Sequence, residues 1–431
     1  MYGASIPSRT HPGAQSEKCD SAAYDSAPRI HSPKNYPDGG PRAWLVVLGA
    51  SCATFSTAGY ANSWGVFQDY YESVLPKGTS PSNIAWIGSI QFSLMFLLAL
   101  IAGRLFDLGY LRGILIPSSI NLVACTILVA ECNEYWQFLL CQGFGIGISG
   151  GLIFGPVMSV IAHWFKKRRS TALGIVASAS PIGGTIFPIV FRNLLATVGF
   201  KWTMRIIALI VFLAMGITNL TTRRRLPPTT LSGGLFNVKQ FKSPAFMVYT
   251  ASGFVAFLGL YTVLTFIDAS APSQGVPESF SSYLVSIANA GNAVGRLASG
   301  FLADQFGAIN VMIPASLVAG VLTFIWPYTR GTAALVTLAV TYGATSGASA
   351  ALLPAPMMAL GEGANVGHRT GMYFTIISLG ALAGPPISGA INHITGAYTD
   401  VGIFAGCSVM VAVFLLVLSR YLVLGGWSGK A

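Results

Sequence analysis

Three polar side chains interrupt long apolar stretches of this sequence and have the chemistry to bind a ligand. Arg296 lies in one apolar run with Asn292 four residues before it, and Asn62 lies in another run. A guanidinium in an apolar environment is costly unless it faces water or a partner, and it binds carboxylates through two parallel hydrogen bonds. We therefore expect Arg296 to bind an anionic group. The alternatives are an arginine that reaches the aqueous interface or one that pairs with Asp304.

The amides of Asn62 and Asn292 fit two roles equally well. They can exchange hydrogen bonds with a bound molecule, or they can join neighbouring helices, as buried amides often do. Aromatic side chains in the same runs could form the apolar wall of a pocket, and we select Tyr60, Tyr261 and Phe374. Such side chains also face lipid or fill gaps, so both roles stay open.

No pattern of catalytic or metal-binding residues accompanies these side chains. The five histidines are scattered and the six cysteines form no Cys-x-x-Cys pair, so we expect no metal, no cofactor and no enzyme active site. Six glycines between 143 and 155 differ from a phosphate-binding loop because no lysine follows the last of them. We interpret them as close-packing positions of a helix.

The composition indicates a membrane protein. Of 431 residues, 53% are hydrophobic and 9% are charged, whereas soluble proteins carry roughly 25% charged residues. So few charges could not cover a water-facing surface. The net charge of +11 comes from short basic clusters between apolar runs, which is typical of membrane proteins and argues against nucleic-acid binding.

Apolar runs near 20 residues recur along the chain, and a helix of that length crosses a bilayer. The runs are continuously apolar, unlike the alternating strands of a β-barrel. The sequence therefore predicts an all-α membrane protein with about twelve transmembrane helices. The expected spans are 43–66, 83–103, 113–131, 137–162, 170–192, 202–222, 245–267, 280–302, 309–328, 333–357, 370–391 and 401–424.

The loops between these spans predict the orientation of the chain. Basic residues gather in alternate loops, above all at 166–169 and 223–225, whereas the other loops hold fewer basic and more acidic residues. By the positive-inside rule, the basic loops and both termini face the cytoplasm. We expect a monomer in the plasma membrane, with the lipid bilayer and a small-molecule substrate as partners.

The longest break between spans divides the chain into two halves. Residues 223–243 are basic and then rich in proline and glycine, so we interpret them as a cytoplasmic linker. The halves are then 41–222 and 244–424. Residues 1–40 are polar and rich in serine, proline and glycine, which predicts a disordered cytoplasmic tail, and 425–431 form a short C-terminal tail.

The halves contain related segments. Gly103 and Asp107 follow the second span, and Gly300 and Asp304 follow the eighth with the same spacing. A second pair of segments opens the fifth and eleventh spans and shares a serine and a glycine when aligned as 169–184 and 369–384. Related segments about half a chain apart indicate two pseudo-symmetric six-helix bundles, as in many transporters.

These features resemble the major facilitator superfamily. Gly103, Asp107 and Arg112 are similar to the superfamily's loop motif between helices two and three. The resemblance implies that Asp107 meets a helix N-terminus or a basic residue of another element. It also implies that Gly103, Asp107, Arg112 and, in the second half, Asp304 control opening of the cytoplasmic side. The alternative is a loop charge without a gating role.

A narrower resemblance is to the monocarboxylate porter family, especially its fungal branch. It covers roughly residues 38–424 and is carried by three segments: DGGPRAW at 38–44, WGVFQDYY at 64–71 and HWFKKRRSTALG at 163–174. In animal members, a first-helix lysine binds the substrate carboxylate, and an aspartate lies four residues before an arginine in the eighth helix. Asn62 and Asn292 stand at these positions here, so the usual proton carrier is missing.

These residues predict a secondary transporter that moves a small organic anion or amphipathic metabolite by alternating access. Loss of the lysine and the aspartate favours a bulkier substrate, such as an exported fungal secondary metabolite. The alternatives are proton-coupled monocarboxylate uptake and a non-transporting nutrient sensor on the same scaffold.

Overall fold

The structure is a computed structural model that describes residues 3, 37–76, 81–228, 241–359, 366–426 and 429–430. All helices belong to one unit, residues 37–431, which is separate from residues 1–36. Most of the expected tail (1–40) and the middle of the expected linker (223–243) lie outside the described residues. The proposed domain boundaries therefore stay predictions.

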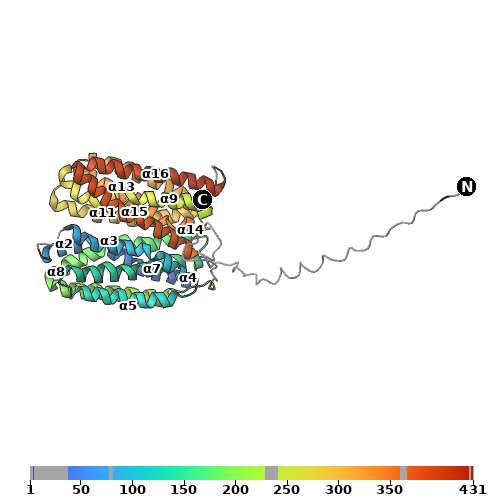
Figure 1. Ribbon diagram of the computed structural model, residues 1–431, viewed down its shortest axis with the longest axis horizontal. Helices are drawn as coiled ribbons and strands as arrows, with labels where there is room; N and C mark the ends of the chain where they lie inside the picture. Colours follow the sequence, from blue (N-terminus) through green and yellow to red (C-terminus); the bar gives the residue numbers. More distant parts are fainter. Residues whose placement is uncertain are drawn as a thin grey trace. The chain divides into compact units, whose positions relative to one another are not determined.

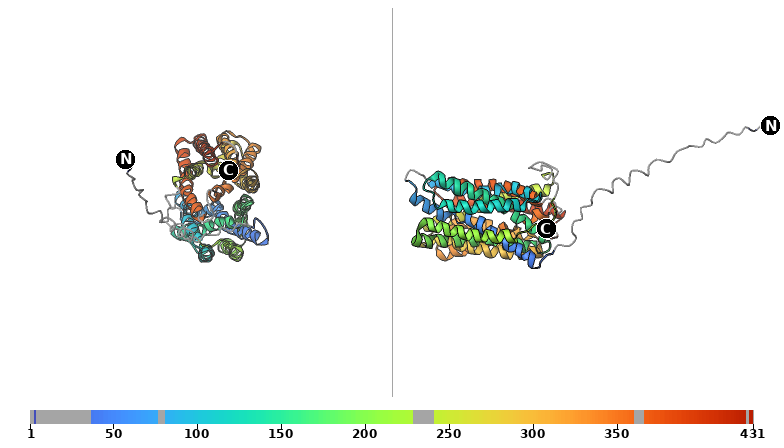
Figure 2. Two further views of the ribbon diagram at one scale, coloured as in Figure 1. Left: turned by 90° about the vertical axis from the view of Figure 1, so that its right-hand side faces the viewer. Right: turned by 90° about the horizontal axis from the view of Figure 1, so that it is seen from below.

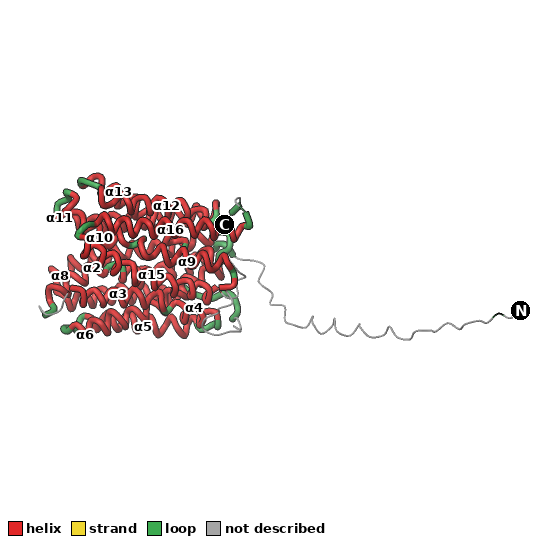
Figure 3. The backbone as a smooth tube through the Cα atoms, turned by 45° about the horizontal axis from the view of Figure 1, so that its top comes forward, coloured by secondary structure: helices red, strands yellow, loops and turns green. Residues whose placement is uncertain are grey.

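The described residues form helices and contain no strand (Figure 3), as the sequence predicts. The first half contains α1 (Pro41–Thr54), η1 (Phe55–Gly59), α2 (Trp64–Val74), α3 (Pro81–Leu97), α4 (Ala99–Asp107), α5 (Leu111–Val129), α6 (Tyr135–Phe138), η2 (Leu139–Ile146), α7 (Gly147–Trp164) and α8 (Arg169–Thr221). The second half contains α9 (Pro244–Gly259), α10 (Thr262–Ser270), η4 (Ala271–Gln274), α11 (Glu278–Phe306), α12 (Ala308–Ile325), η5 (Trp326–Tyr328), α13 (Thr332–Leu352), α14 (Pro354–Ala359), α15 (Val366–Thr395) and α16 (Tyr398–Leu424).

Ten helical stretches among the described residues are long and apolar enough to cross a membrane. One of them, α8, has 53 residues, about 80 Å of helix against a hydrocarbon core of about 30 Å. Gly199 inside α8 has a φ of 75°, which breaks the helix. The indole of Trp164, before α8, donates a hydrogen bond to the carbonyl of Arg223, after α8. Both ends of α8 therefore lie at the same end of the bundle, and α8 contributes two crossings.

The twelfth crossing is α11, which has 29 residues. It is less apolar than the other stretches because it carries Asn289, Asn292 and Arg296. The twelve crossings agree with the predicted count. The predicted loop between the fifth and sixth spans, 193–201, is instead helical apart from the break at Gly199.

Two helices are interrupted at related places in the halves. A turn at Asn62 and Ser63 separates η1 from α2, and a turn at Leu260 and Tyr261 separates α9 from α10. A broken helix leaves main-chain groups without helical partners, which membrane proteins tolerate where the break borders a cavity. The breaks thus mark a level of the bundle at which a site can form.

The two halves lie side by side with their helices along a common direction (Figure 1). The left view of Figure 2 shows the helices nearly end-on, with the blue and green helices of the first half below the yellow to red helices of the second. Contacts between the halves are made chiefly by α8 with α11 and by α3 and α4 with α15.

One end of the bundle carries most of the described basic residues, and we call it the basic end. Hydrogen bonds and close contacts connect its loops and helix ends. Its basic residues include Arg104, Arg112, Lys166, Lys167, Arg168, Arg169, Arg223, Arg224, Arg225, Arg369, Arg420 and Lys430. The other end, with α2, α6 and η5, is called the opposite end.

Candidate functional site

A small cavity of about 50 Å³ lies between the halves, beside both helix breaks. Residues of α1, η1, α3, α7 and α8 line it from the first half, and residues of α9, α11, α13, α14 and α15 line it from the second. Its principal lining side chains are Asn62, Phe92, Phe96, Phe154, Ser180, Phe257, Tyr261, Arg296 and Phe374. Four of the six predicted binding residues are among them: Arg296, Asn62, Tyr261 and Phe374.

Arg296 is 9% exposed and is held by neutral groups. Its Nε donates to Oδ1 of Asn292 at 2.6 Å, and its Nη1 donates to the carbonyl of Ala177 in α8 at 3.1 Å. The alternative partner, Asp304, instead accepts hydrogen bonds from α8. Within the described part of the chain, no carboxylate forms an ion pair with Arg296. The guanidinium therefore lines the cavity with its charge uncompensated.

The two amides differ in position. Asn62 lines the cavity and donates from Nδ2 to the hydroxyl of Ser180 at 2.9 Å, which joins the first helix to α8. Asn292 is buried beneath Arg296, and its side-chain oxygen accepts the hydrogen bond from Nε. Asn292 thus orients the guanidinium and is not among the residues that line the cavity.

Aromatic side chains form much of the cavity lining, and we call them the aromatic wall. Phe374 packs against Phe96 and Phe154, with ring centroids 5.8 and 5.3 Å apart. Tyr261 packs edge-on against Phe257 at 5.3 Å and Phe92 at 6.0 Å. Edge-to-face pairs of this kind hold rings in fixed orientations. The cavity therefore combines a cationic side chain and a few polar groups with the aromatic wall.

Tyr60 lies away from the cavity, contrary to its predicted place in the pocket wall. It is 1% exposed and packs on Phe67 at 5.1 Å and on Phe187 at 5.7 Å, inside the first half. The π-helical turn η1 comes just before it. A π-turn inserts a residue and rotates the following side chains to a different face, which the periodicity of the sequence did not reveal.

Two carboxylates connect the halves at the basic end. Asp107, at the end of α4, accepts hydrogen bonds from the main-chain N–H groups of Gly367 and His368 at 3.1 and 2.8 Å. Asp304, near the end of α11, accepts hydrogen bonds from the N–H groups of Ser170 and Thr171 at 2.8 and 2.9 Å. Each carboxylate thus caps the first turn of a helix from the other half, where unpaired N–H groups favour negative charge.

Glycines allow the helices to approach closely beside both carboxylates. A Cβ on Gly103 would lie 2.1 Å from the carbonyl oxygen of Gly367, and a Cβ on Gly174 would lie 2.5 Å from that of Arg296. Such distances exclude any side chain at these positions unless the helices separate. The two carboxylate caps and their glycine contacts are called the latches below.

The latches establish the register of the repeat. Asp107 and Asp304 are 197 positions apart in the sequence, and their first partners, Ser170 and Gly367, have the same separation. The sequence alignment of 169–184 with 369–384 was therefore shifted by three residues. The shared serine and glycine in that alignment are coincidental, because Gly174 corresponds to Gly371 in the structural register.

Arg112 is exposed, and the described residues offer it no hydrogen bond or ion pair. Arg224, which sequence reasoning assigned only to the linker, lies beside the first latch instead. Its Nη1 donates to the carbonyl of Phe106, and its guanidinium lies 5.4 Å from the Phe106 ring centroid. The separation of Arg224 from Asp107 by 117 positions gave no sequence signal for this contact.

The segment that begins with Asp38 is anchored to the loop between α7 and α8. Oδ1 of Asp38 accepts hydrogen bonds from the N–H groups of Lys166 and Lys167, both at 2.6 Å. The ring of Trp44 packs edge-on against Phe165 at 5.3 Å. The first and third family-like segments are therefore neighbours, and they fix the loop that leads into the second latch.

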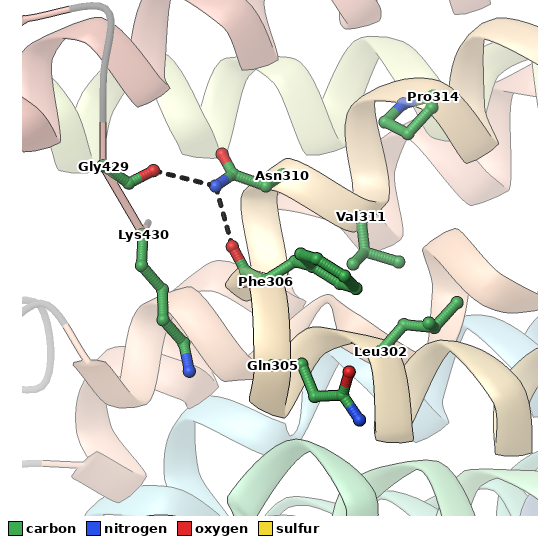
Figure 4. Close-up of a pocket in the computed structure, with 8 residues that line it drawn as sticks. All are labelled: Leu302, Gln305, Phe306, Asn310, Val311, Pro314, Gly429 and Lys430. Atoms are coloured by element: carbon green, nitrogen blue, oxygen red, sulfur yellow. Dashed lines mark hydrogen bonds between the residues drawn. The ribbon is translucent and has the colours of Figure 1, made fainter.

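A larger hollow at the basic end is a surface feature unrelated to the inter-half cavity. It is open, has a volume of about 550 Å³ and lies between α11, α12 and the C-terminal residues (Figure 4). Nδ2 of Asn310 donates to the carbonyls of Phe306 and Gly429, which holds the tail against the α11–α12 turn. All its lining residues come from the second half, so it offers no path between the two sides of a membrane.

The family assignment follows from comparison with known proteins. The sequence pattern described as Major Facilitator Superfamily matches residues 44–361 and, again, residues 249–424. The chain belongs to the Major Facilitator Superfamily. It is a multi-pass membrane transporter.

Relatives of this transporter are found in filamentous fungi. It is 36% identical to the MFS transporter asaE of Aspergillus flavus, over 89% of this chain and 88% of that protein. It is 34% identical to the aspyridones efflux protein apdF of Emericella nidulans, over 88% of this chain and 79% of that protein. It is also 34% identical to the fujikurins efflux protein of Gibberella fujikuroi, over 94% of this chain and 87% of that protein.

Solved structures agree in fold. The human organic anion transporter MFSD10 matches this transporter with a TM-score of 0.68 and 16% identity, over 88% of this chain and 100% of that one. The transporter FucP in its outward conformation matches with a TM-score of 0.68 and 15% identity, over 87% of this chain and 98% of that one. The narrower resemblance to monocarboxylate porters stays a prediction.

Proposed function

We propose that this transporter exports an amphipathic organic anion, of the kind made as a fungal secondary metabolite, by alternating access. The observation that carries the proposal is the position of Arg296, a buried cation with neutral partners at the edge of an inter-half cavity. A carboxylate or sulfonate would complete its hydrogen bonds and compensate its charge. Asn62 and Ser180 supply further polar contacts in the same cavity.

The aromatic wall favours a substrate with an apolar, preferably ring-containing body. Phe96, Phe374 and Tyr261 line the same cavity as Arg296, and the rings of Phe96 and Phe374 contact each other. Ligand sites commonly combine apolar walls with a few placed polar groups. Two relatives are named as efflux proteins for aspyridones and fujikurins, which supports export of a metabolite larger than lactate.

The size of the cavity supports an opening movement. Drug-sized ligands occupy cavities of roughly 300–1,000 Å³, far more than the 50 Å³ found here. Both latches hold the basic end closed. We therefore infer that the halves separate at the opposite end in one state, and that release of Asp107 and Asp304 opens the basic end in the other. Gly103 allows the closed contact, and Arg112 has no part in it.

The remaining parts of the proposal concern location. We place the transporter in the plasma membrane as a monomer, because one chain supplies the lining of the cavity. The excess of basic residues at one end favours a cytoplasmic basic end. The monocarboxylate-porter assignment is part of this proposal, although an amide replaces the carboxylate beside Arg296.

The test is transport of 1-naphthalenesulfonate, a ring-bearing and permanently charged probe, by purified protein in lipid vesicles. Arg296→Ala should lower transport at least about tenfold, because a charge-assisted hydrogen bond contributes roughly 1.5–3 kcal/mol. Arg296→Lys should retain part of the transport activity, since the positive charge remains but the planar guanidinium with its paired N–H donors is lost. Arg330→Ala at the opposite end is the matched control and should transport normally. Unchanged transport by Arg296→Ala would refute the docking role, and transport of lactate in preference to the probe would favour monocarboxylate uptake.

A further inference from the structure

The charge balance of the cavity has a consequence for how transport is driven. Apart from Arg296, the only titratable side chain among the described residues that line the cavity is Tyr261. The groups packed against the guanidinium from α8 and α11 are a carbonyl and an amide. The lining residues contributed by α13, α14 and the residue between them are Ala350, Ala351, Leu353 and Pro354, which are uncharged.

The nearest described carboxylates lie beyond the cavity on both sides. Asp69 and Asp268 are each seven residues from a lining residue, Asn62 and Tyr261, or about 10 Å of helix toward the opposite end. Asp304 is eight residues from Arg296, or about 12 Å of helix toward the basic end, and both its oxygens are occupied by N–H groups of α8. No described carboxylate is therefore placed to exchange a proton with a substrate at Arg296.

Without substrate, the cavity consequently carries one net positive charge, and with a monovalent anion it is neutral. A charge at the site experiences the potential of whichever side the cavity is open to, and each elementary charge moved through a membrane potential changes the free energy. Reorientation of the empty site then moves one charge, whereas reorientation of the loaded site moves none. A negative potential on one side favours the empty site facing that side, where it captures the anion.

We propose that this transporter is an anion uniporter driven by the membrane potential, with Arg296 as the charge that responds to it and without uptake of a proton. The proposal rests on the proposed function, because it needs an anionic substrate at Arg296. In a cell whose interior is negative, the potential alone would drive export. The energy source would thus be the electrical gradient, and neither ATP nor a proton gradient is required.

The experiment uses the full chain in vesicles with 1-naphthalenesulfonate, whose sulfonate stays ionised at every working pH. A potassium gradient with valinomycin sets the potential, and buffers set the pH gradient independently. We expect the probe to accumulate on the positive side, approaching a tenfold ratio for each 59 mV, and to show no accumulation from a pH gradient at zero potential. Accumulation driven by the pH gradient alone, or transport that requires an anion on the far side, would overturn the proposal.

Asn292→Asp tests the charge itself. The introduced carboxylate keeps the shape of the amide and can accept the hydrogen bond from Nε, but it cancels the charge of Arg296. Potential-driven transport should fall at least about tenfold at neutral pH and recover as the pH is lowered, because protonation restores the positive site. Asn193→Asp, an exposed change at the opposite end, is the matched control and should behave as the unaltered protein.

A further pair of variants addresses the distant carboxylates. Asp69→Asn and Asp268→Asn should leave the response to potential unchanged, and loss of that response in either would overturn the proposal. Different results would refute the proposed function and the uniport mechanism. Absence of any probe transport would refute the proposed function, whereas transport that follows pH and ignores the potential would refute only the uniport mechanism.

Discussion

At the residue scale, the sequence predicted Arg296 and Asn292 as site residues but left the role of Asn292 open. Arg296 stands out because a charged side chain in an apolar run is costly unless it faces water or a partner. Asn292 was predicted either to contact a bound molecule or to join neighbouring helices, and its position one helical turn away places its oxygen on the guanidinium. Under the proposed function, the amide therefore acts on the substrate through Arg296. Hydrogen-bonding capacity can be predicted from residue type, but its direction depends on packing.

Phe374 gives a prediction about the aromatic wall. Phe374→Leu keeps the side chain apolar but removes the ring contacts with Phe96 and Phe154. An aromatic contact contributes about 0.5–1.5 kcal/mol beyond burial, so the KM for 1-naphthalenesulfonate should rise about 2- to 12-fold. The KM for an aliphatic sulfonate of similar size should change less.

The same substitution at Phe414, which is 68% exposed on the outer surface of α16, is the control and should alter neither KM. Equal loss for both sulfonates in Phe374→Leu would show that the ring only fills space. Vesicle transport at several probe concentrations separates KM from the maximal rate.

At the element scale, the sequence predicted the crossings well and their interruptions poorly. Continuous apolar runs determine where helices cross, since each must satisfy its backbone inside the membrane. The breaks at Asn62 and Leu260 have no proline, so the commonest sequence signal of a helix interruption is absent from both. The chain reversal inside α8 depends on one glycine, Gly199, with a positive φ. The three-residue error in repeat register arose because serine and glycine are frequent in all these helices.

Gly103 gives a prediction about the first latch. In Gly103→Ala, the added methyl group would lie 2.1 Å from the carbonyl oxygen of Gly367. The helices α4 and α15 must therefore move apart to accommodate the methyl group. Overpacking of this kind costs about 1–3 kcal/mol. The ratio of closed to open basic ends should therefore fall about 5- to 150-fold.

The change can be measured with spin labels on two introduced cysteines, in a background without native cysteines. Tyr110→Cys and Gln305→Cys are suitable positions because both are exposed and lie in different halves. The distance between the two labels should become longer when the basic end opens. Gly113→Ala, where a Cβ would meet nothing within 4 Å, is the control. An unchanged distance distribution in Gly103→Ala would mean that the glycine contact does not hold the basic end closed.

At the scale of the whole molecule, the two related halves differ where they line the cavity and are alike at the latches, where they contact each other. The latches share partners, spacing and glycines at an offset of 197 positions. The position that corresponds to Arg296 is Ala99, so the second half alone supplies the positive charge of the cavity lining. Under the proposed function, symmetric latches allow both halves to move as similar bodies, and the asymmetric charge orients an amphipathic substrate.

The orientation of the bundle in the membrane gives the last prediction. Asp38, near the start of the described unit, and Lys430, near its end, both contact residues of the basic end, as twelve crossings require. Because basic residues concentrate there, that end should face the cytoplasm. In intact cells that express a variant without native cysteines, a membrane-impermeant maleimide should label Arg330→Cys, at the opposite end, and should label Lys167→Cys only after permeabilisation. Both positions are exposed, so a difference in labelling reports sidedness. Labelling of Lys167→Cys in intact cells would place the basic end outside and refute the predicted orientation. It would leave the direction of transport unchanged, because the potential draws an anion toward the positive side in either orientation.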